Sequence, residues 1–256
     1  MRIHKICTCL FDWIYVILSD EIMNNLQLKD VILLTRTKLR DRTLPEYSKG
    51  EEIFNMVSHI AGGAFAVSAL VLCVITAAIH SNTWGIVGSA IYGVTMILLY
   101  TMSSIYHGLR AGTGKKVFQV IDHCSIFLLI AGTYTPITLV SIREESPVWG
   151  WIVFALVWGA AILGVVLNSI DLKKYKIFSM ICYIGTGWGI VIALPVALRA
   201  LSTPAFVLIL TGGIAYTIGA VMYGLGKKKK FMHSMFHLMV ILGSVLHFAA
   251  IIGFVL

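Results

Sequence analysis

The sequence predicts an all-α membrane protein whose seven transmembrane helices form a single bundle. Of its 256 residues, 58% are hydrophobic and only 12% are charged, whereas soluble domains carry about 25% charged residues. The 20 Lys and Arg residues are confined to the N-terminal tail and to short polar gaps between apolar blocks. Each apolar block reaches the roughly 20 residues that a helix needs to cross a bilayer. Lipid is therefore the expected solvent for most of the chain.

Seven apolar segments follow one another along the chain. They are residues 53–79, 84–107, 117–140, 147–168, 177–198, 203–224 and 231–256. Because lipid offers the backbone no hydrogen-bond partner, each segment is expected to be a helix. A β-barrel would show alternating segments of about ten residues, whereas the fourth segment contains the non-alternating run WIVFALVWGAAILGVVL. Pro136 and Pro195 predict kinks in the third and fifth helices.

The charges in the gaps predict how the bundle is oriented. The gaps after the second, fourth and sixth segments carry ten basic residues, and the other three gaps carry two, Arg143 and Arg199. Five more basic residues lie between Arg36 and Lys49, just before the first segment. Positively charged loops stay in the cytoplasm. The N-terminus is therefore expected inside the cell and the C-terminus outside.

Two regions are expected, a cytoplasmic tail over residues 1–50, to which the sequence assigns no role, and a membrane domain over residues 51–256. The five cysteines form no CxxC pair and three of them lie in apolar segments, so neither a disulfide framework nor a zinc knuckle is expected. The net charge of +8 resides in the tail and the gaps, where it sets topology. Membrane lipids, and not nucleic acids, are the expected partners.

Few ionisable side chains lie within the apolar segments. A charged group at the bilayer centre costs at least about 2.5 kcal/mol, so such residues are candidates for function. They are His59, His107, Asp122, His123, His233, His237 and His247. The predicted topology brings all but one of them to the cytoplasmic ends of the first, second, third and seventh helices. The exception is His247, which lies about 21 Å deeper than His233 along the same helix.

Three histidines in two short motifs indicate a metal site. His233 and His237, in HSMFH, project from one helical face and can bind one ion together. His107, in SSIYH, can supply a third nitrogen, and three histidines with one open position are the ligand set of a catalytic zinc. Asp122 is then the candidate proton acceptor, and Ser103, one turn from His107, can hold a water molecule or polarise a carbonyl. Two other interpretations stay open: interfacial histidines, and an aspartate that relays protons.

The remaining polar residues of the segments are expected to have supporting roles. His247 is too deep to be a ligand and is expected to hydrogen-bond within the bundle. His123 projects about 100° away from Asp122 on the helix, so it can contribute only indirectly. Glu52 and His59 share a helical face with Asn55 beside the site, where they either support it or cap the first helix.

Four segments together resemble a known family. They are EEIFNMVSH, SSIYH, DHCSIFLLIAGTYTP and HSMFH. From about residue 45 to the end, the chain resembles the hemolysin III proteins, the bacterial branch of the progestin and adipoQ receptor family, which is related to the adiponectin receptors and more distantly to the alkaline ceramidases. The resemblance implies a seven-helix bundle in the bacterial plasma membrane, with zinc held by His107, His233 and His237. It also implies that Asp122 reaches the zinc through water and that Ser103 matches the family's serine.

Two kinds of function follow from this resemblance. The first is an intramembrane zinc hydrolase of lipid amides or esters, with Asp122 as general base and Ser103 as electrophilic help. The second is a protein in which zinc is structural, either a cytolysin that permeabilises membranes or a sensor of the membrane's state. A secreted pore-former must first be soluble, and this composition does not favour a soluble form. A retinal protein is excluded because the last apolar segment contains no Lys.

Overall fold

The computed structural model of the protein describes residues 37–80, 82–225 and 229–256. Within these ranges seven helical spans are long and apolar enough to cross a membrane, and no strand occurs. The spans are α3 (Lys49–Ile79), α4 (Thr83–Gly108), α5 (Thr113–Pro136) continued by η2 (Ile137–Ile142) and α6 (Arg143–Glu145), α7 (Pro147–Asp171), α8 (Lys176–Gly187) continued by η3 (Gly189–Ala193) and α9 (Leu194–Ala200), α10 (Thr203–Leu225), and α11 (Met232–Phe254). The predicted fold class is confirmed, with span boundaries within about five residues of the predicted ones.

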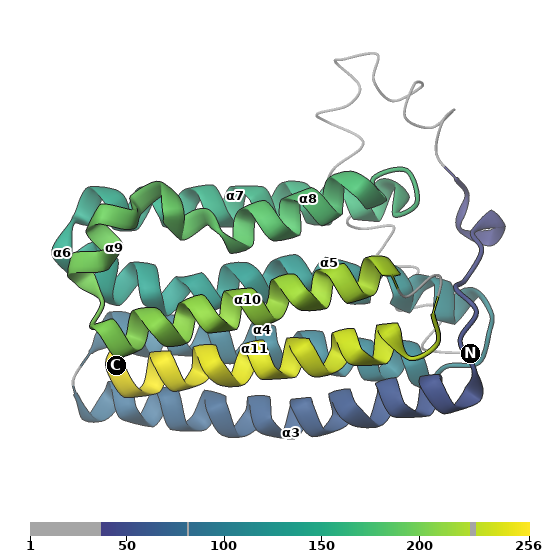
Figure 1. The fold of residues 1–256 in the computed structure, drawn as a ribbon, viewed down its shortest axis with the longest axis horizontal. Coiled ribbons are helices and arrows are strands. Elements are labelled where there is room, and N and C mark those ends of the chain that lie inside the picture. Colours follow the sequence, from purple (N-terminus) through teal and green to yellow (C-terminus); the bar gives the residue numbers. More distant parts are fainter. Residues whose placement is uncertain (1–36, 81, 226–228) are drawn as a thin grey trace, which may run out of the picture.

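The spans run side by side along the long axis of the molecule (Figure 1). Helix α3 packs against α4 and α11, α4 packs against α5, α5 against α7, and α10 against α11. The third span is the central one, because 78% of its apolar stretch is buried, against 50% or less in every other span. The start of α3 and the end of α11 lie at opposite ends of the bundle (Figure 1), as an odd number of spans requires.

Local hydrogen bonds set where α3 and α11 begin. Ser48 and Glu51 form a capping box at the start of α3, in which each side chain accepts a hydrogen bond from the other residue's backbone N–H. The second carboxylate oxygen of Glu51 accepts the backbone N–H of Phe231 at 2.7 Å. Phe231 has a left-handed backbone (φ 61°) and directly precedes α11. One glutamate thus joins the first turns of the first and last spans.

The regular α-helix changes near both of the prolines at which kinks are predicted. Pro136 ends α5, and the six residues that follow it form π-helical turns before α6 begins. In the fifth span, the 3-10 segment η3 lies directly before α9, which carries Pro195 at its start. Proline lacks the N–H that would continue the ladder of the preceding turn. At both prolines where a kink is predicted, the structure shows a change of helix type.

The described tail residues run across one end of the bundle before α3 begins. The backbone N–H of Thr37 donates to Asp171 Oδ2 at 2.8 Å, and Arg42 Nη2 donates to the carbonyl of Ile170 at 3.1 Å. Both partners lie in the last turn of α7. Residues 37–48 are thus tied to the fourth span, and they end next to the first. Of the tail predicted over residues 1–50, residues 1–36 lie outside the described residues.

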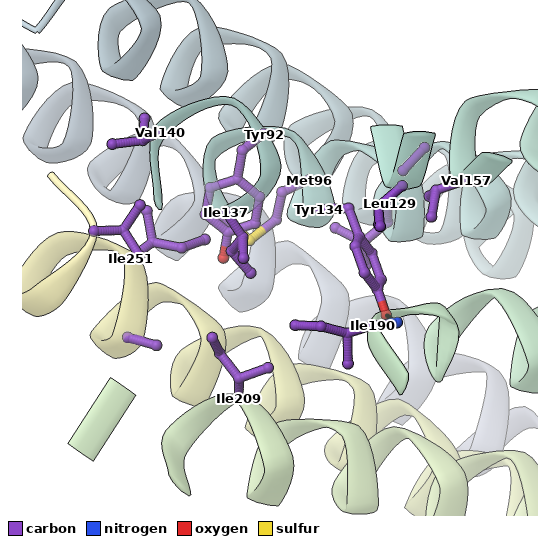
Figure 2. Close-up of a cluster of buried hydrophobic side chains, with 14 of the residues drawn as sticks. Tyr92, Met96, Leu129, Tyr134, Ile137, Val140, Val157, Ile190, Ile209 and Ile251 are labelled. Atoms are coloured by element: carbon purple, nitrogen blue, oxygen red, sulfur yellow. Dashed lines mark hydrogen bonds between the residues drawn. The ribbon is translucent and has the colours of Figure 1, made fainter. Parts of the chain in front are cut away.

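The interior is filled by large apolar side chains from several spans (Figure 2). Tyr92 and Met96 of α4 are completely buried, and Tyr134 of α5 accepts the backbone N–H of Ile190 at 3.0 Å. The outer surface is also apolar, with many exposed valine, leucine and isoleucine side chains on α3, α7 and α10. An exposed apolar surface of this extent fits a lipid environment.

Glycines allow the closest helix contacts. A Cβ at Gly62 of α3 would lie 2.7 Å from the ring of Tyr100 in α4, and one at Gly88 of α4 would lie 2.8 Å from the Cα of Pro136. Small residues at such positions let helix backbones approach each other, which is the main way helices pack in membranes.

The α5–α7 contact gives a stability prediction. Gly164 of α7 faces the buried ring of Phe127, and a Cβ there would overlap that ring. We expect Gly164→Ala to lower the midpoint of thermal unfolding in detergent, because overpacking a core costs about 1–3 kcal/mol. Gly159→Ala in the same helix is the matched control, since its Cβ meets nothing within 4 Å. An equal loss in both variants would contradict a tight contact at Gly164.

The orientation can be tested with fusions to alkaline phosphatase, which is active only outside the cytoplasm. We expect a fusion after Leu256 to be active and a fusion within Lys227–Lys230 to be inactive, because the basic gaps are predicted to be cytoplasmic. The measurement is phosphatase activity of intact cells at equal expression. The reverse pattern would contradict the predicted orientation.

Candidate metal centre

Three histidines converge at the end of the bundle where α4 ends and α11 begins. His107 comes from the last turn of α4, and His233 and His237 come from the first two turns of α11. The Nε2 atom of His233 lies 3.3 Å from Nε2 of His107 and 3.1 Å from Nε2 of His237. All three side chains are buried. The three residues that the sequence selected are thus brought to one point from two spans.

Two of the three separations among these nitrogens match a tetrahedral metal site. Imidazole nitrogens bind zinc at about 2.0–2.1 Å, so two ligands of a tetrahedral ion are about 3.3 Å apart. The two measured separations, 3.1 and 3.3 Å, agree with that value. One ligand atom from each histidine lies within 4.8 Å of the others. The buried three-histidine group can therefore hold a metal ion.

Glu52 of α3 orients His107. Its Oε2 lies 2.7 Å from Nδ1 of His107, and its Oε1 accepts a hydrogen bond from Nζ of Lys115 at 2.6 Å. Because a carboxylate only accepts, Nδ1 of His107 donates, and Nε2 is left with its lone pair toward the other two histidines. Carboxylates commonly hold metal-binding histidines in this way. Of the two roles expected for Glu52, the structure shows support of the site, since Glu51 makes the cap.

Tyr47 covers the group on the side of the tail, and the sequence did not reveal it. Its ring stacks on His233 with 4.8 Å between ring centroids and lies 5.8 Å from His107. Burial raises the pKa of the Tyr47 phenol well above its usual range, so the hydroxyl stays neutral. Tyr47 precedes the first span and therefore lies outside the apolar segments. The only feature of the sequence that could have indicated this role is the position of a tyrosine just before a span that carries a histidine.

A cavity begins beside the three histidines. His233 lines it together with Asp122 of α5 and Ser103 of α4. The Ser103 hydroxyl faces the Asp122 carboxylate, and both side chains are buried. Asp122 is not part of the three-histidine group. Among the described residues that line the cavity, Asp122 is the only acid.

His123 belongs to a different network from the three histidines. Its Nδ1 donates to the carbonyl of Gln119 at 2.8 Å, and its Nε2 lies 3.0 Å from the hydroxyl of Tyr223 in α10. Its contact with Asp122 is a longer one, at 3.7 Å. The helical geometry that separates neighbouring side chains by about 100° accounts for this arrangement.

His59 and Asn55 of α3 add polar groups next to the site. The ring of His59 stacks on His237 with 3.8 Å between centroids. All four side-chain nitrogen and oxygen atoms of Asn55 and His59 are buried and have no hydrogen-bond partner among the described residues. Buried polar atoms are normally paired with protein or ordered water.

His247 lies away from the three histidines, as its position farther along the seventh helix predicts. Its Nδ1 donates to the carbonyl of Gly243, one turn earlier in α11, at 2.8 Å. The expectation that it hydrogen-bonds within the bundle is confirmed. It also lines the same cavity as His233, at a greater depth.

Comparison with known proteins identifies the family of the chain. The model of the family described as "Haemolysin-III related" matches residues 47–248. Hemolysin-3 of Bacillus cereus is 36% identical over 206 residues, which cover 80% of this chain and 92% of that protein. A Hemolysin-3 homolog of Bacillus subtilis (strain 168) is 35% identical over 202 residues, covering 79% and 93%. The human monocyte to macrophage differentiation factor is 23% identical over 190 residues, covering 72% and 77%. The chain therefore belongs to the haemolysin-III-related family and is a multi-pass membrane protein.

Proposed function

We propose that the protein is a zinc-dependent hydrolase of membrane lipid amides or esters. One observation carries the proposal: His233 belongs both to the three-histidine group and to the lining of an intramembrane cavity, and Asp122 and Ser103 line the same cavity. A metal-binding group, a carboxylate and a hydroxyl therefore meet at one end of a space that a substrate can occupy.

The donor set favours zinc. Three neutral imidazole nitrogens suit zinc, copper, iron or nickel, and the 3.1 and 3.3 Å separations fit the tetrahedral geometry that zinc adopts. Among the described residues no cysteine or carboxylate joins the group. Three protein ligands leave one position open, which is typical of catalytic zinc. When bound, zinc supplies Lewis-acid polarisation at this position.

Asp122 has the chemistry and the place of a general base. It is the only acid among the described lining residues, and it lies beside the cavity end that His233 borders. Hydrolysis forms a bond from a water oxygen to the carbonyl carbon and breaks the carbon–nitrogen or carbon–oxygen bond of the substrate. Asp122 accepts the proton from the water and returns it to the leaving amine or alcohol. A free fatty acid and an amine or alcohol are the products.

Ser103 can position the reacting groups. Its hydroxyl faces the Asp122 carboxylate from one turn before His107. A hydroxyl both donates and accepts, so Ser103 can orient the Asp122 carboxylate and donate to the substrate carbonyl. Tyr47 covers the group from the tail side, which limits the access of bulk water.

The cavity favours a substrate with a hydrocarbon chain. It is lined by residues of six spans, and most of the side chains are apolar, among them Leu99, Ile126, Ile130, Ile184 and Val240. It extends from the level of Asp122 to that of His247. A mostly apolar lining with polar groups at one end suits a hydrocarbon chain whose carbonyl lies at the polar end.

Metal content tests the ligand assignment. We expect the purified protein to carry about one zinc per chain, and His107→Ala and His237→Ala to lose it, because two remaining imidazoles hold the ion too weakly. The measurement is metal analysis by mass spectrometry after dialysis.

Two control variants sharpen this test. His247→Ala should retain zinc, because the ring of His247 lies deep in the cavity and away from the three ligand histidines. Glu52→Gln should keep the ion with roughly 10- to 100-fold lower affinity, since it removes the carboxylate that orients His107. Full zinc content in both ligand variants would show that the ion is bound elsewhere.

The variant Asp122→Asn separates a catalytic zinc from a structural one. It keeps the size of the side chain and removes the base, so we expect unchanged zinc content and a loss of about 100-fold or more in rate. The assay is fatty acid release from solubilised ceramides, N-acyl amides and lysophospholipids at equal zinc occupancy. Equal release by the variant and the wild type would exclude Asp122 as the base. No release from any substrate by the wild type would overturn the hydrolase proposal and favour a structural metal.

A further inference from the structure

His247 marks the end of the cavity that is farthest from the three histidines. It lies ten residues after His237 in α11 and lines the same cavity as Asp122 and His233. At 1.5 Å per residue, it is roughly 15 Å from His237 along the helix axis. A ligand that extends through the cavity therefore reaches His247 with its far end.

The hydrogen bond to Gly243 determines which atom His247 offers. Its Nδ1 lies 2.8 Å from the carbonyl of Gly243. A carbonyl oxygen only accepts, so Nδ1 carries the proton, and Nε2 of the neutral ring is an acceptor. Because Nδ1 is turned toward its own helix, Nε2 is the ring nitrogen left for the cavity.

Packing holds the ring of His247 in this orientation. The ring of Tyr216 stacks on it with 5.2 Å between centroids and 17° between the planes. On α10, a Cβ at Gly212 would lie 2.5 Å from two atoms of the imidazole, so the ring rests directly on the glycine backbone. The acceptor is therefore fixed in place before any ligand arrives, and its partner must come to it.

Every other polar side chain around this part of the cavity has a partner within the described residues. The pairs are Thr133 with the carbonyl of Leu129, Tyr134 with that of Gly187, Trp188 with the Thr217 hydroxyl, Thr217 with the carbonyl of Gly213, and Tyr216 with the Ser244 hydroxyl. No hydrogen bond to Nε2 of His247 occurs among the described residues. Its lone pair is thus the one polar feature of the far end that the described protein leaves open.

An open acceptor in an apolar membrane cavity is costly unless an occupant satisfies it. We infer that His247 is a specificity-determining residue that accepts a hydrogen bond from a hydroxyl group on the distal part of a lipid acyl chain. This inference rests on the proposed function only in that a lipid occupies the cavity with its carbonyl at the three-histidine end. It adds that chains with a distal hydroxyl are preferred over plain ones.

The test is competition binding to the full-length zinc-loaded protein in detergent. Hexadecanoic acid and hydroxyhexadecanoic acids, with the hydroxyl at successive positions from carbon 8 to carbon 16, displace the fluorescent fatty acid cis-parinaric acid. We expect at least one hydroxy acid with a distal hydroxyl to bind about tenfold more tightly than the plain acid, which corresponds to one hydrogen bond. This comparison needs no variant, so it does not depend on how substitutions fold.

Two variants then assign the preference to His247. His247→Phe keeps a ring against Tyr216 but has no acceptor, so it should bind the plain and hydroxy acids equally. His247→Gln retains an acceptor and should restore part of the preference. Zinc content and thermal unfolding of both variants report that the fold is intact.

The outcomes separate this inference from the proposed function. If the wild type binds fatty acids with no preference for a distal hydroxyl, or if His247→Phe keeps the preference, the role of His247 is overturned while the lipid cavity stands. If the wild type binds neither cis-parinaric acid nor the competing acids, lipid occupancy fails, and both the proposed function and the role of His247 fail with it.

Discussion

The hydrocarbon core of a bilayer offers no hydrogen bonds, and this constraint shapes the whole molecule. Backbone groups are satisfied within helices, and polar side chains find partners inside the bundle. Tyr100 and Tyr216 both reach the hydroxyl of Ser244, for example, at 2.8 and 3.0 Å. Against this background, the unpaired side-chain atoms of Asn55 and His59 stand out, because the ring of His59 stacks on His237 of the metal centre. In a membrane interior such exceptions indicate places where a ligand, an ion or water is expected.

The metal centre depends on how the first and last spans begin. Glu51 joins the start of α3 to Phe231, directly before α11, and Glu52, the next residue, holds His107 of α4. Two neighbouring glutamates thus set the positions of three spans at one end of the bundle. The centre is consequently built on helix ends held by hydrogen bonds, which gives the preorganised geometry that a metal site requires.

Several parts of the site were predictable from the residues. The HxxxH spacing places His233 and His237 on one helical face, and the order of the spans brings His107 and Asp122 to the same end of the bundle. Both follow from the rise and the turn of an α-helix together with alternating span direction. The role of Tyr47 was not predictable, because its ring reaches His233 through a non-helical segment that no periodic pattern describes.

The sequence by itself determined the solvent of the chain, the seven spans, the family and the three histidines. These depend on local properties: apolar length, helical period and motif spacing.

Only the tertiary structure decided that Glu52 binds His107, while Glu51 makes the cap. It also decided that His247 ends a cavity which begins at Asp122. Such relations depend on how the spans are rotated and packed against one another, through contacts such as that of Gly212 with His247. Helix rotation is set by the sum of many interhelical contacts, and no single stretch of sequence encodes it.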